Sequence, residues 1–185
     1  VHPESLPVII VAKASILLQW EQKLAEWSNN NPDLTPFIFR KGTDPVSKFF
    51  KVYITTYDLV PKLQAKFSKL EIKTLILDEC QAIKNSSSKR TNAVRELSKG
   101  IPNIIGTSGS AILNNMLEFF PLLNILYPRQ FSDLRTYAED WTSTFWDKVT
   151  GTIKPGGLRK SREKAWKELT SKFILHYTRE QVAPD

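Results

Sequence analysis

Short apolar runs alternate with amphipathic stretches between residues 8 and 106 of the chain. A short apolar run bounded by polar residues is typical of a strand buried on both faces of a parallel sheet. Such runs predict strands at residues 8–11, 37–39, 52–55, 74–78 and 103–106.

Apolar residues spaced three and four positions apart predict amphipathic helices between these strands. The clearest helix has these apolar side chains on one face: Ile16, Leu17, Trp20, Leu24 and Trp27. Further helices are predicted at residues 57–68 and 88–98. Because strands that alternate with helices through short connections favour βαβ units, the sequence predicts an α/β fold with a mainly parallel sheet and helices on both faces.

The chain from Asn114 to Asp185 is rich in aromatic residues and predicts a mainly helical extension, interrupted by Pro155-Gly156-Gly157. One predicted helical face is apolar: Leu158, Trp166, Leu169 and Phe173. Basic side chains cover the other faces: Arg159, Lys160, Arg162, Lys164 and Lys167. This basic surface is either a solvated face over packed apolar residues or a surface that follows a polyphosphate.

Composition narrows the class of partner. A chain of 185 residues with 41% hydrophobic content can bury one core. Its net charge of +7 favours a polyanion, and nucleic acid before membrane, because no stretch has the apolar length of a transmembrane helix. The single cysteine, Cys80, excludes an internal disulfide and indicates a reducing, intracellular compartment, while two histidines are too few for a usual zinc site.

Two adjacent carboxylates, Asp78 and Glu79, end the apolar run at 74–78. Open α/β sheets bind their ligands at the carboxyl ends of their strands. In nucleotide-hydrolysing enzymes, the first carboxylate at such a strand end holds Mg²⁺, and the second orients or deprotonates the attacking water. The alternative is structural, with Asp78 capping the next helix and Glu79 simply solvated.

Four segments, in order, resemble conserved blocks of the Swi/Snf-type helicase-like ATPases, a family of helicase superfamily two. They are residues 7–20 (Pro-Val-Ile-Ile-Val-Ala-Lys-Ala-Ser to Trp), 52–57 (Val-Tyr-Ile-Thr-Thr-Tyr), 78–85 (Asp-Glu-Cys-Gln-Ala-Ile-Lys-Asn) and 108–115 (Ser-Gly-Ser-Ala-Ile-Leu-Asn-Asn). Residues 173–182 further resemble the element that closes the first lobe of that family, although His176-Tyr177 replaces its Arg pair.

The resemblance implies the first RecA-like lobe of a motor that hydrolyses ATP and moves along duplex DNA, with a three-layer α/β architecture. It implies that Asp78 holds Mg²⁺, through water, on the nucleotide phosphates and that Glu79 positions the lytic water. It assigns Gln81 to coupling between the nucleotide and the DNA-side segments. Gly109 and Ser110 are implied to relay this coupling.

The same resemblance implies contacts to DNA phosphates from Lys13, Ser15, Thr55 and Thr56. Short hydroxyls and backbone N–H groups at strand-to-helix turns suit phosphate oxygens, and such contacts carry no base information. Each has a structural alternative. Ser15 is a good N-cap, the two threonines fit a strand end, and Gly109 can simply make a turn.

The resemblance also sets the expected organisation. Residues 1–127 correspond to a RecA-like core, 128–172 to a helical insertion and 173–185 to the end of the first lobe, together one partial domain. The family's phosphate-binding loop is missing, since the chain has no G-x-x-x-x-G-K-[ST] motif, and it begins at Val1 without Met. We therefore expect a piece of a longer protein that hydrolyses no ATP alone.

The expected partners are duplex DNA, a second RecA-like lobe of the same protein, and chromatin or another DNA-bound protein, with no membrane. A eukaryotic parent would be nuclear. The alternative is a non-hydrolysing DNA-binding or scaffold module that keeps the fold.

Overall fold

The structure is a computed structural model that describes residues 3–109, 116–143, 145–154 and 156–175. The chain forms two compact units. Unit 1 comprises Val1–Asn114 and Glu118–Asp133, and unit 2 comprises Asn115–Leu117 and Leu134–Asp185. The main division falls between Asp133 and Leu134.

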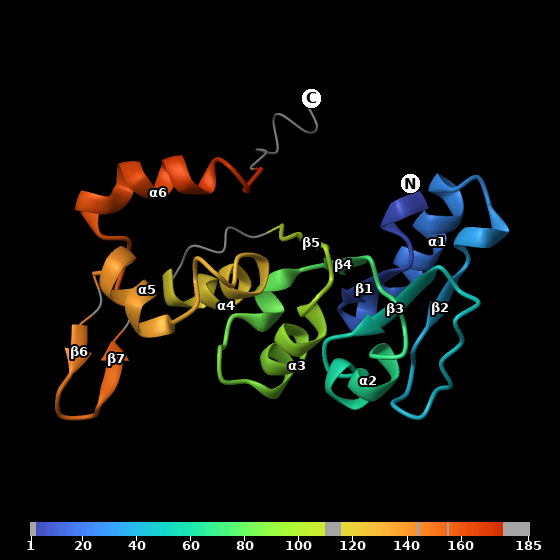
Figure 1. The fold of residues 1–185 in the computed structure, drawn as a ribbon, viewed down its shortest axis with the longest axis horizontal. Coiled ribbons are helices and arrows are strands. Elements are labelled where there is room, and N and C mark those ends of the chain that lie inside the picture. The colour runs from blue at the N-terminus through green and yellow to red at the C-terminus, as the bar shows by residue number, and fades with distance from the viewer. Residues whose placement is uncertain (1–2, 110–115, 144, 155, 176–185) are drawn as a thin grey trace. The chain divides into compact units, whose positions relative to one another are not determined.

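Unit 1 is built on a sheet of parallel strands in the order β2-β3-β1-β4-β5 (Figure 1). The strands are β1 (Val8–Ala12), β2 (Pro36–Ile38), β3 (Val52–Thr56), β4 (Thr74–Leu77) and β5 (Asn103–Gly106). The predicted strands are confirmed, with small shifts at their ends. Strands β1, β3 and β4 lie at the centre of the sheet and are almost wholly buried. Their sequences are mainly apolar because both of their faces are covered.

Helices cover both faces of this sheet (Figure 1). The helices of unit 1 are α1 (Leu17–Trp27), α2 (Val60–Phe67), α3 (Lys89–Ser98) and most of α4 (Met116–Leu126), with short 3-10 turns η2 (Ala14–Ile16) and η4 (Cys80–Ile83). Leu17, Trp20 and Leu24 of α1 pack on a cluster that includes Val8 and Ile10. Residues that alternate with these along the strands, such as Ile9, face the opposite side. The α/β three-layer prediction is confirmed.

Unit 2 contains α5 (Leu134–Trp141), the antiparallel strands β6 (Phe145–Asp147) and β7 (Thr152–Lys154), a 3-10 turn η5 (Lys160–Arg162) and α6 (Glu163–Thr170). Trp166 of α6 is buried, and its ring lies 5.2 Å from that of Trp141 and 6.3 Å from that of Tyr137. The predicted apolar face of the last helix is thus a packing face at Trp166. Leu158, by contrast, precedes the helix and forms an isolated bridge with Thr142.

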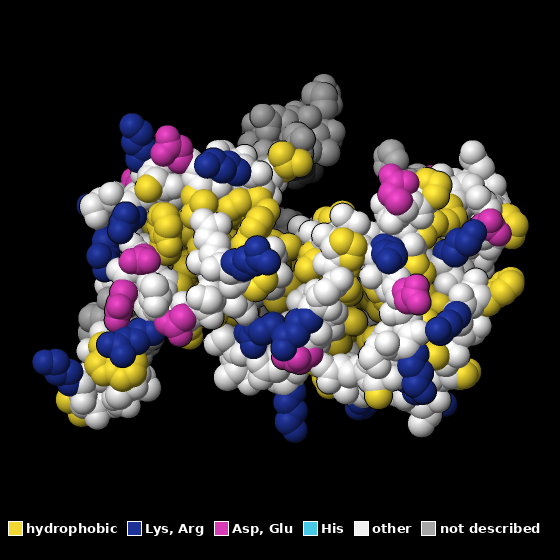
Figure 2. Space-filling model, in the orientation of Figure 1, with side chains coloured by type: hydrophobic (Ala, Val, Ile, Leu, Met, Phe, Trp, Pro, Cys, Tyr) yellow, Lys and Arg dark blue, Asp and Glu magenta, His cyan; other side chains and the backbone are white. Residues whose placement is uncertain are grey.

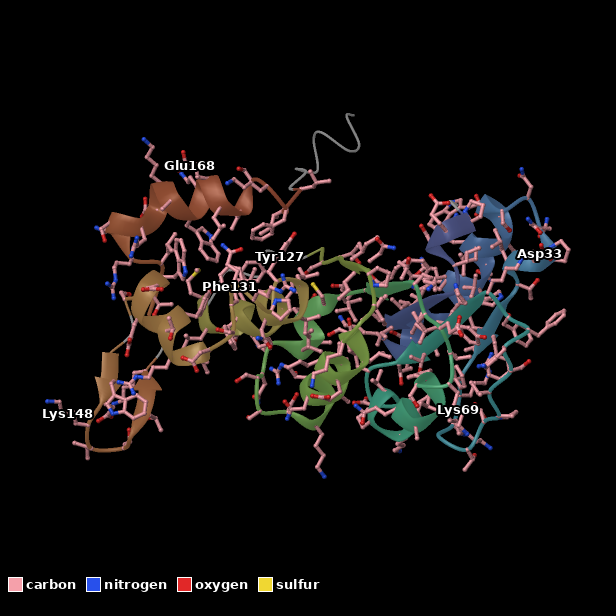
Figure 3. The ribbon with its side chains drawn as sticks, viewed as in Figure 1. Asp33, Lys69, Tyr127, Phe131, Lys148 and Glu168 are labelled. Atoms are coloured by element: carbon pink, nitrogen blue, oxygen red, sulfur yellow. The ribbon has the colours of Figure 1, made fainter. Side chains whose placement is uncertain are left out.

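The β6–β7 hairpin is an element that sequence analysis did not predict. The Asp147 carboxylate accepts a hydrogen bond from the backbone N–H of Val149 and forms an ion pair with Lys154 at 2.8 Å. The hydrogen bond from Lys154, together with those from the turn, lowers the pKa of Asp147 to about 2. Lys148 projects from the turn (Figure 3).

Basic side chains are dispersed over the visible face of each unit rather than gathered on one element (Figure 2). In the part of the chain that the structure describes, every helix is too short or too polar to cross a membrane.

Candidate functional site

The carboxyl ends of three neighbouring strands bring the predicted site residues to one edge of the sheet. Ala12 of β1 pairs with Thr56 of β3, and Val11 pairs with Leu77 of β4. The residues that follow these strands, Lys13 and Asp78, therefore lie along the same edge as Thr56. This is the edge at which parallel α/β sheets bind ligands.

The Asp78 carboxylate is held by one donor on each oxygen. The Trp20 indole N–H donates to Oδ2 at 2.7 Å, and the Thr107 hydroxyl donates to Oδ1 at 3.0 Å. The backbone N–H of Asp78 also donates to the Val11 carbonyl at 2.9 Å, which continues the β1–β4 ladder. Asp78 therefore caps no helix, and its half-buried carboxylate has a fixed orientation at the rim of the sheet.

Tyr57 secures the backbone at the same point. Its hydroxyl donates to the Asp78 carbonyl oxygen at 2.8 Å. Burial, with smaller contributions from the neighbouring Cys80, Asp78 and Glu79, raises the pKa of Tyr57 far above its ordinary value. The phenol therefore stays protonated, and remains a donor, throughout the physiological pH range.

Glu79, Gln81 and Ser108 form a chain of side-chain hydrogen bonds between two loops. The Ser108 hydroxyl donates to Gln81 Oε1 at 2.8 Å, and the Gln81 side-chain amide donates in turn to Glu79 Oε2. The two loops are also joined by their backbones, since the Cys80 N–H donates to the Thr107 carbonyl at 2.9 Å. A shift of the loop at 107–109 would therefore move the Glu79 carboxylate through these hydrogen bonds.

Glu79 adopts a left-handed backbone conformation, with φ of +51° and ψ of +53°. Side chains other than glycine rarely occupy this region, because Cβ approaches the following carbonyl oxygen. Strain of this kind persists where the position of a side chain matters more than local stability. The strained position here carries the second of the two acidic residues.

We expect Glu79→Gly to be more stable than Glu79→Ala by about 1 kcal/mol, which reverses the usual order of the two residues. Both substitutions remove the carboxylate, so their difference isolates the cost of the positive φ. Urea unfolding of the two variants measures it. The matched control is the pair Glu21→Gly and Glu21→Ala inside helix α1, where the alanine variant should be the more stable. Equal stability of the two variants at position 79 would show that no backbone strain is stored there.

Gly109 lies beside the acidic pair, and Ser110 falls outside the described residues. A Cβ added at Gly109 would lie 4.0 Å from Glu79 Oε1. Its φ is not positive, so glycine is not required there by backbone conformation. Space does not require glycine there either, because 4.0 Å is an ordinary van der Waals distance.

The predicted phosphate contacts differ in exposure. Lys13 and Ser15 are exposed at the turn between β1 and α1, and the Ser15 side chain caps neither η2 nor α1. Thr56 is half-buried at the end of β3. Thr55 is fully buried, and its hydroxyl makes no hydrogen bond. Three of these side chains can reach a ligand at this edge, whereas that of Thr55 is packed inside the fold.

Cys80 follows the acidic pair in sequence and is buried. Burial raises the pKa of its thiol to about 11. We expect iodoacetamide at pH 8 to alkylate the native thiol at least about 100-fold more slowly than the unfolded one, because the reactive thiolate is depleted by that factor between pKa 9 and 11. Mass spectrometry with and without urea measures both rates. Native alkylation at the unfolded rate would place Cys80 at the surface.

The acidic edge fits Mg²⁺ bound together with a nucleotide. Mg²⁺ in phosphate-transfer sites is held by one or two carboxylates and the substrate phosphates, with water completing the shell. Asp78 supplies such oxygens at a half-buried rim. Within the described residues, no group of three or more His, Cys, Asp or Glu side chains forms a cage of protein ligands. The donor set therefore suits Mg²⁺ brought by a phosphate ligand.

Sequence analysis missed the side chains that fix the Asp78 carboxylate. Trp20 was placed on an apolar helical face, and Thr107 and Tyr57 were given no role at the site. A signal was available, because buried Trp and Tyr residues usually find a partner for their polar atom. The identity of that partner required the tertiary fold.

The chain is similar to proteins named as chromatin-remodeling ATPases and helicases. The profile of the SNF2-related domain matches residues 2–185. The chromatin-remodeling ATPase INO80 of Gibberella zeae is 31% identical over 91% of this chain, and the helicase domino of Drosophila melanogaster is 28% identical over 90%. The chain spans 10% and 6% of these two relatives.

The same fold occurs in a solved structure. The Sulfolobus solfataricus SWI2/SNF2 ATPase core in complex with double-stranded DNA superposes with a TM-score of 0.76 at 21% identity. The match covers 95% of this chain and 34% of that one. At this identity the likeness concerns the fold.

Proposed function

This chain belongs to the SNF2-related domain family, and from that premise we propose that it is the first RecA-like lobe of an ATP-driven motor that moves along duplex DNA. The observation that carries the proposal is the acidic pair at the end of β4, linked by Gln81 to the loop at Ser108. A scaffold has no physical need for two carboxylates at this edge. A motor needs them at the nucleotide, together with a connection to a second segment.

Each polar residue has a part in this proposal. Asp78 would hold Mg²⁺ through water, and the metal when bound neutralises charge on the phosphates. Glu79 accepts a hydrogen bond from the attacking water and orients it. Gln81 and Ser108 tie the position of Glu79 to the loop at 107–109, in which Gly109 lies beside the Glu79 carboxylate. Ser110 is proposed, from its sequence position alone, to extend this relay.

The DNA side of the proposal rests on the exposed turn after β1 and the end of β3. Lys13, Ser15 and Thr56 can meet backbone phosphates there, and such contacts tolerate any base sequence. Thr55 is better assigned to packing, because its side chain is fully buried. These positions lie on the same sheet edge as Asp78, so DNA and nucleotide would meet one rigid platform.

The whole protein would supply what this chain lacks. The 185 residues contain no G-x-x-x-x-G-K-[ST] motif, so we propose that ATP hydrolysis needs a phosphate-binding loop and a second RecA-like lobe from outside these residues. The relatives are named as chromatin-remodeling ATPases and a helicase, and we propose chromatin or other DNA-bound protein as the object of the motor, in the nucleus where the cell has one.

ATP hydrolysis by the full-length protein, measured with and without duplex DNA, tests the proposal. We expect duplex DNA to stimulate hydrolysis strongly, and the isolated 185-residue chain to hydrolyse no ATP under either condition. Absence of hydrolysis by the full-length protein in both conditions would favour the second candidate, a DNA-binding scaffold that has kept the carboxylates without their chemistry.

We expect the isolated chain to bind duplex DNA weakly and to lose that binding as salt rises, because phosphate contacts release counterions. A plot of log affinity against log salt has a slope of about −0.9 for each phosphate neutralised, so Lys13→Gln should make the slope shallower by about 1. Fluorescence anisotropy with labelled duplex measures both chains. Lys73→Gln is the control, since Lys73 precedes β4 at the opposite edge of the sheet. Salt-insensitive binding would exclude phosphate contacts as its basis.

A further inference from the structure

The Asp78 carboxylate, proposed to hold Mg²⁺, accepts a hydrogen bond from helix α1, which follows the turn with the proposed DNA contacts. The Trp20 indole N–H reaches Asp78 Oδ2 at 2.7 Å, across 58 positions of sequence. The indole N–H can only donate, and a carboxylate acceptor makes such a bond shorter and stronger than a neutral pair. In this hydrogen bond the indole is therefore always the donor and the carboxylate the acceptor, at a short distance.

Helix α1 holds this indole in place by packing. Trp20 lies against the core cluster that contains Val8, Ile10 and Leu17, and its ring meets that of Trp27 edge to face at 6.5 Å. A ring constrained on several sides cannot turn its N–H elsewhere without moving the helix. The position of the Asp78 carboxylate is thus tied to the position of α1.

The same helix begins at Leu17, directly after the 3-10 turn η2, which contains Ser15 and follows Lys13. The three α-helical steps from Leu17 to Trp20 span about 4.5 Å along the axis, so a short segment connects the turn that would meet DNA with the carboxylate that would meet Mg²⁺. This connection is separate from the Gln81–Ser108 contact, which reaches Glu79.

We propose that Trp20 is a positioning residue for the Asp78 carboxylate, and that it transmits displacement of the β1–α1 turn to that carboxylate. The inference rests on the proposed function of Asp78. Each carboxylate oxygen keeps a lone pair after accepting its hydrogen bond from Trp20 or Thr107, so the arrangement leaves room for Mg²⁺-bound water. Loss of the indole N–H would free the Asp78 carboxylate to rotate. Loss of the whole Trp20 ring would instead disturb the core.

Trp20→Phe separates these two roles, because phenylalanine keeps an aromatic ring and removes the donor. In the full-length protein we expect the Mg²⁺ concentration for half-maximal ATP hydrolysis to rise about tenfold, as for other substitutions next to metal ligands, with a smaller change in kcat. Trp146→Phe, at an exposed ring of the β6–β7 hairpin, should leave the Mg²⁺ dependence unchanged. An unchanged Mg²⁺ dependence in Trp20→Phe would overturn the proposal.

A second measurement needs no activity. In the chain labelled with ¹⁵N-tryptophan, the indole signals of its five tryptophans can be assigned by single Trp→Phe changes. We expect the Trp20 indole proton to exchange with water at least about tenfold more slowly than that of exposed Trp146, and Asp78→Ala to remove this protection. Protection that survives Asp78→Ala would mean that packing alone holds the ring, which overturns the inference. If the wild-type protein hydrolyses no ATP, the proposed function fails, while the exchange result still decides the contact.

Discussion

Glu79→Gln in the full-length protein should lower ATP turnover by about 10²–10⁴-fold while leaving binding of Mg²⁺ and ATP nearly unchanged. The reason is that the amide keeps the size of the side chain and an oxygen that can accept from Gln81, but it cannot take a proton from the attacking water. The measurements are steady-state hydrolysis with duplex DNA present and equilibrium binding of a fluorescent ATP analogue.

Glu71→Gln is the matched control for this substitution. Glu71 is exposed and precedes β4, at the opposite end of the strand from Glu79, so its loss should change neither turnover nor binding. Hydrolysis at the wild-type rate by Glu79→Gln would remove Glu79 from the catalytic role. A loss of nucleotide binding that matched the loss of turnover would instead give Glu79 a binding role.

The sheet could be predicted from sequence because burial imposes a simple pattern on it. A central parallel strand covered on both faces must be mostly apolar, and residues 8–11, 52–55 and 74–77 meet that demand, with Thr55 and Thr74 as the polar exceptions. The acidic pair could be placed for the same reason, since it marks where the buried strand reaches the rim. Strand order depends on long-range pairing, and local patterns do not encode it.

The contacts around Asp78 could not be predicted, because they join parts of the chain far apart in sequence. Trp20 occupies a position on the apolar stripe of α1, where its spacing says only that it faces the core. Thr55 and Thr56 are alike in sequence, yet β3 is buried up to Thr55, whereas Thr56 ends the strand at the rim and is only half-buried. Neighbouring residues of the same type can therefore have opposite roles.

The unpredicted β6–β7 hairpin shows a different limit. The sequence contains a hairpin signal, which consists of Thr152-Ile153 together with Asp147 and Gly151. The aromatic residues around this segment favoured helices instead. Gly151 has φ of +62°, the left-handed conformation that favours glycine in a turn. A short hairpin between helices has too few residues for its period-two pattern to stand out.

The geometry around Asp78 makes Asp78→Asn the most informative substitution at this site. Asparagine can point its Oδ1 to the Trp20 indole and its amide group to the Thr107 hydroxyl, which can accept as well as donate. Both partners therefore keep a hydrogen bond. The change removes the negative charge without leaving a donor unpaired, so the unfolding midpoint should stay close to that of the wild type.

ATP hydrolysis by the full-length protein should nevertheless fall by about 10²-fold or more in Asp78→Asn, because charge stabilisation by a bound metal is worth several kcal/mol and about 1.4 kcal/mol corresponds to a factor of ten. Asp58→Asn is the control, since Asp58 carries an exposed ion pair with Arg90. Hydrolysis measured across a Mg²⁺ series distinguishes the cause: a deficit that high Mg²⁺ partly restores indicates weakened metal binding. Full activity at ordinary Mg²⁺, in a variant that folds as well as the wild type, would mean that other residues hold the metal. The hydrogen bonds from Trp20 and Thr107 to Asp78 would then serve only the stability of the fold.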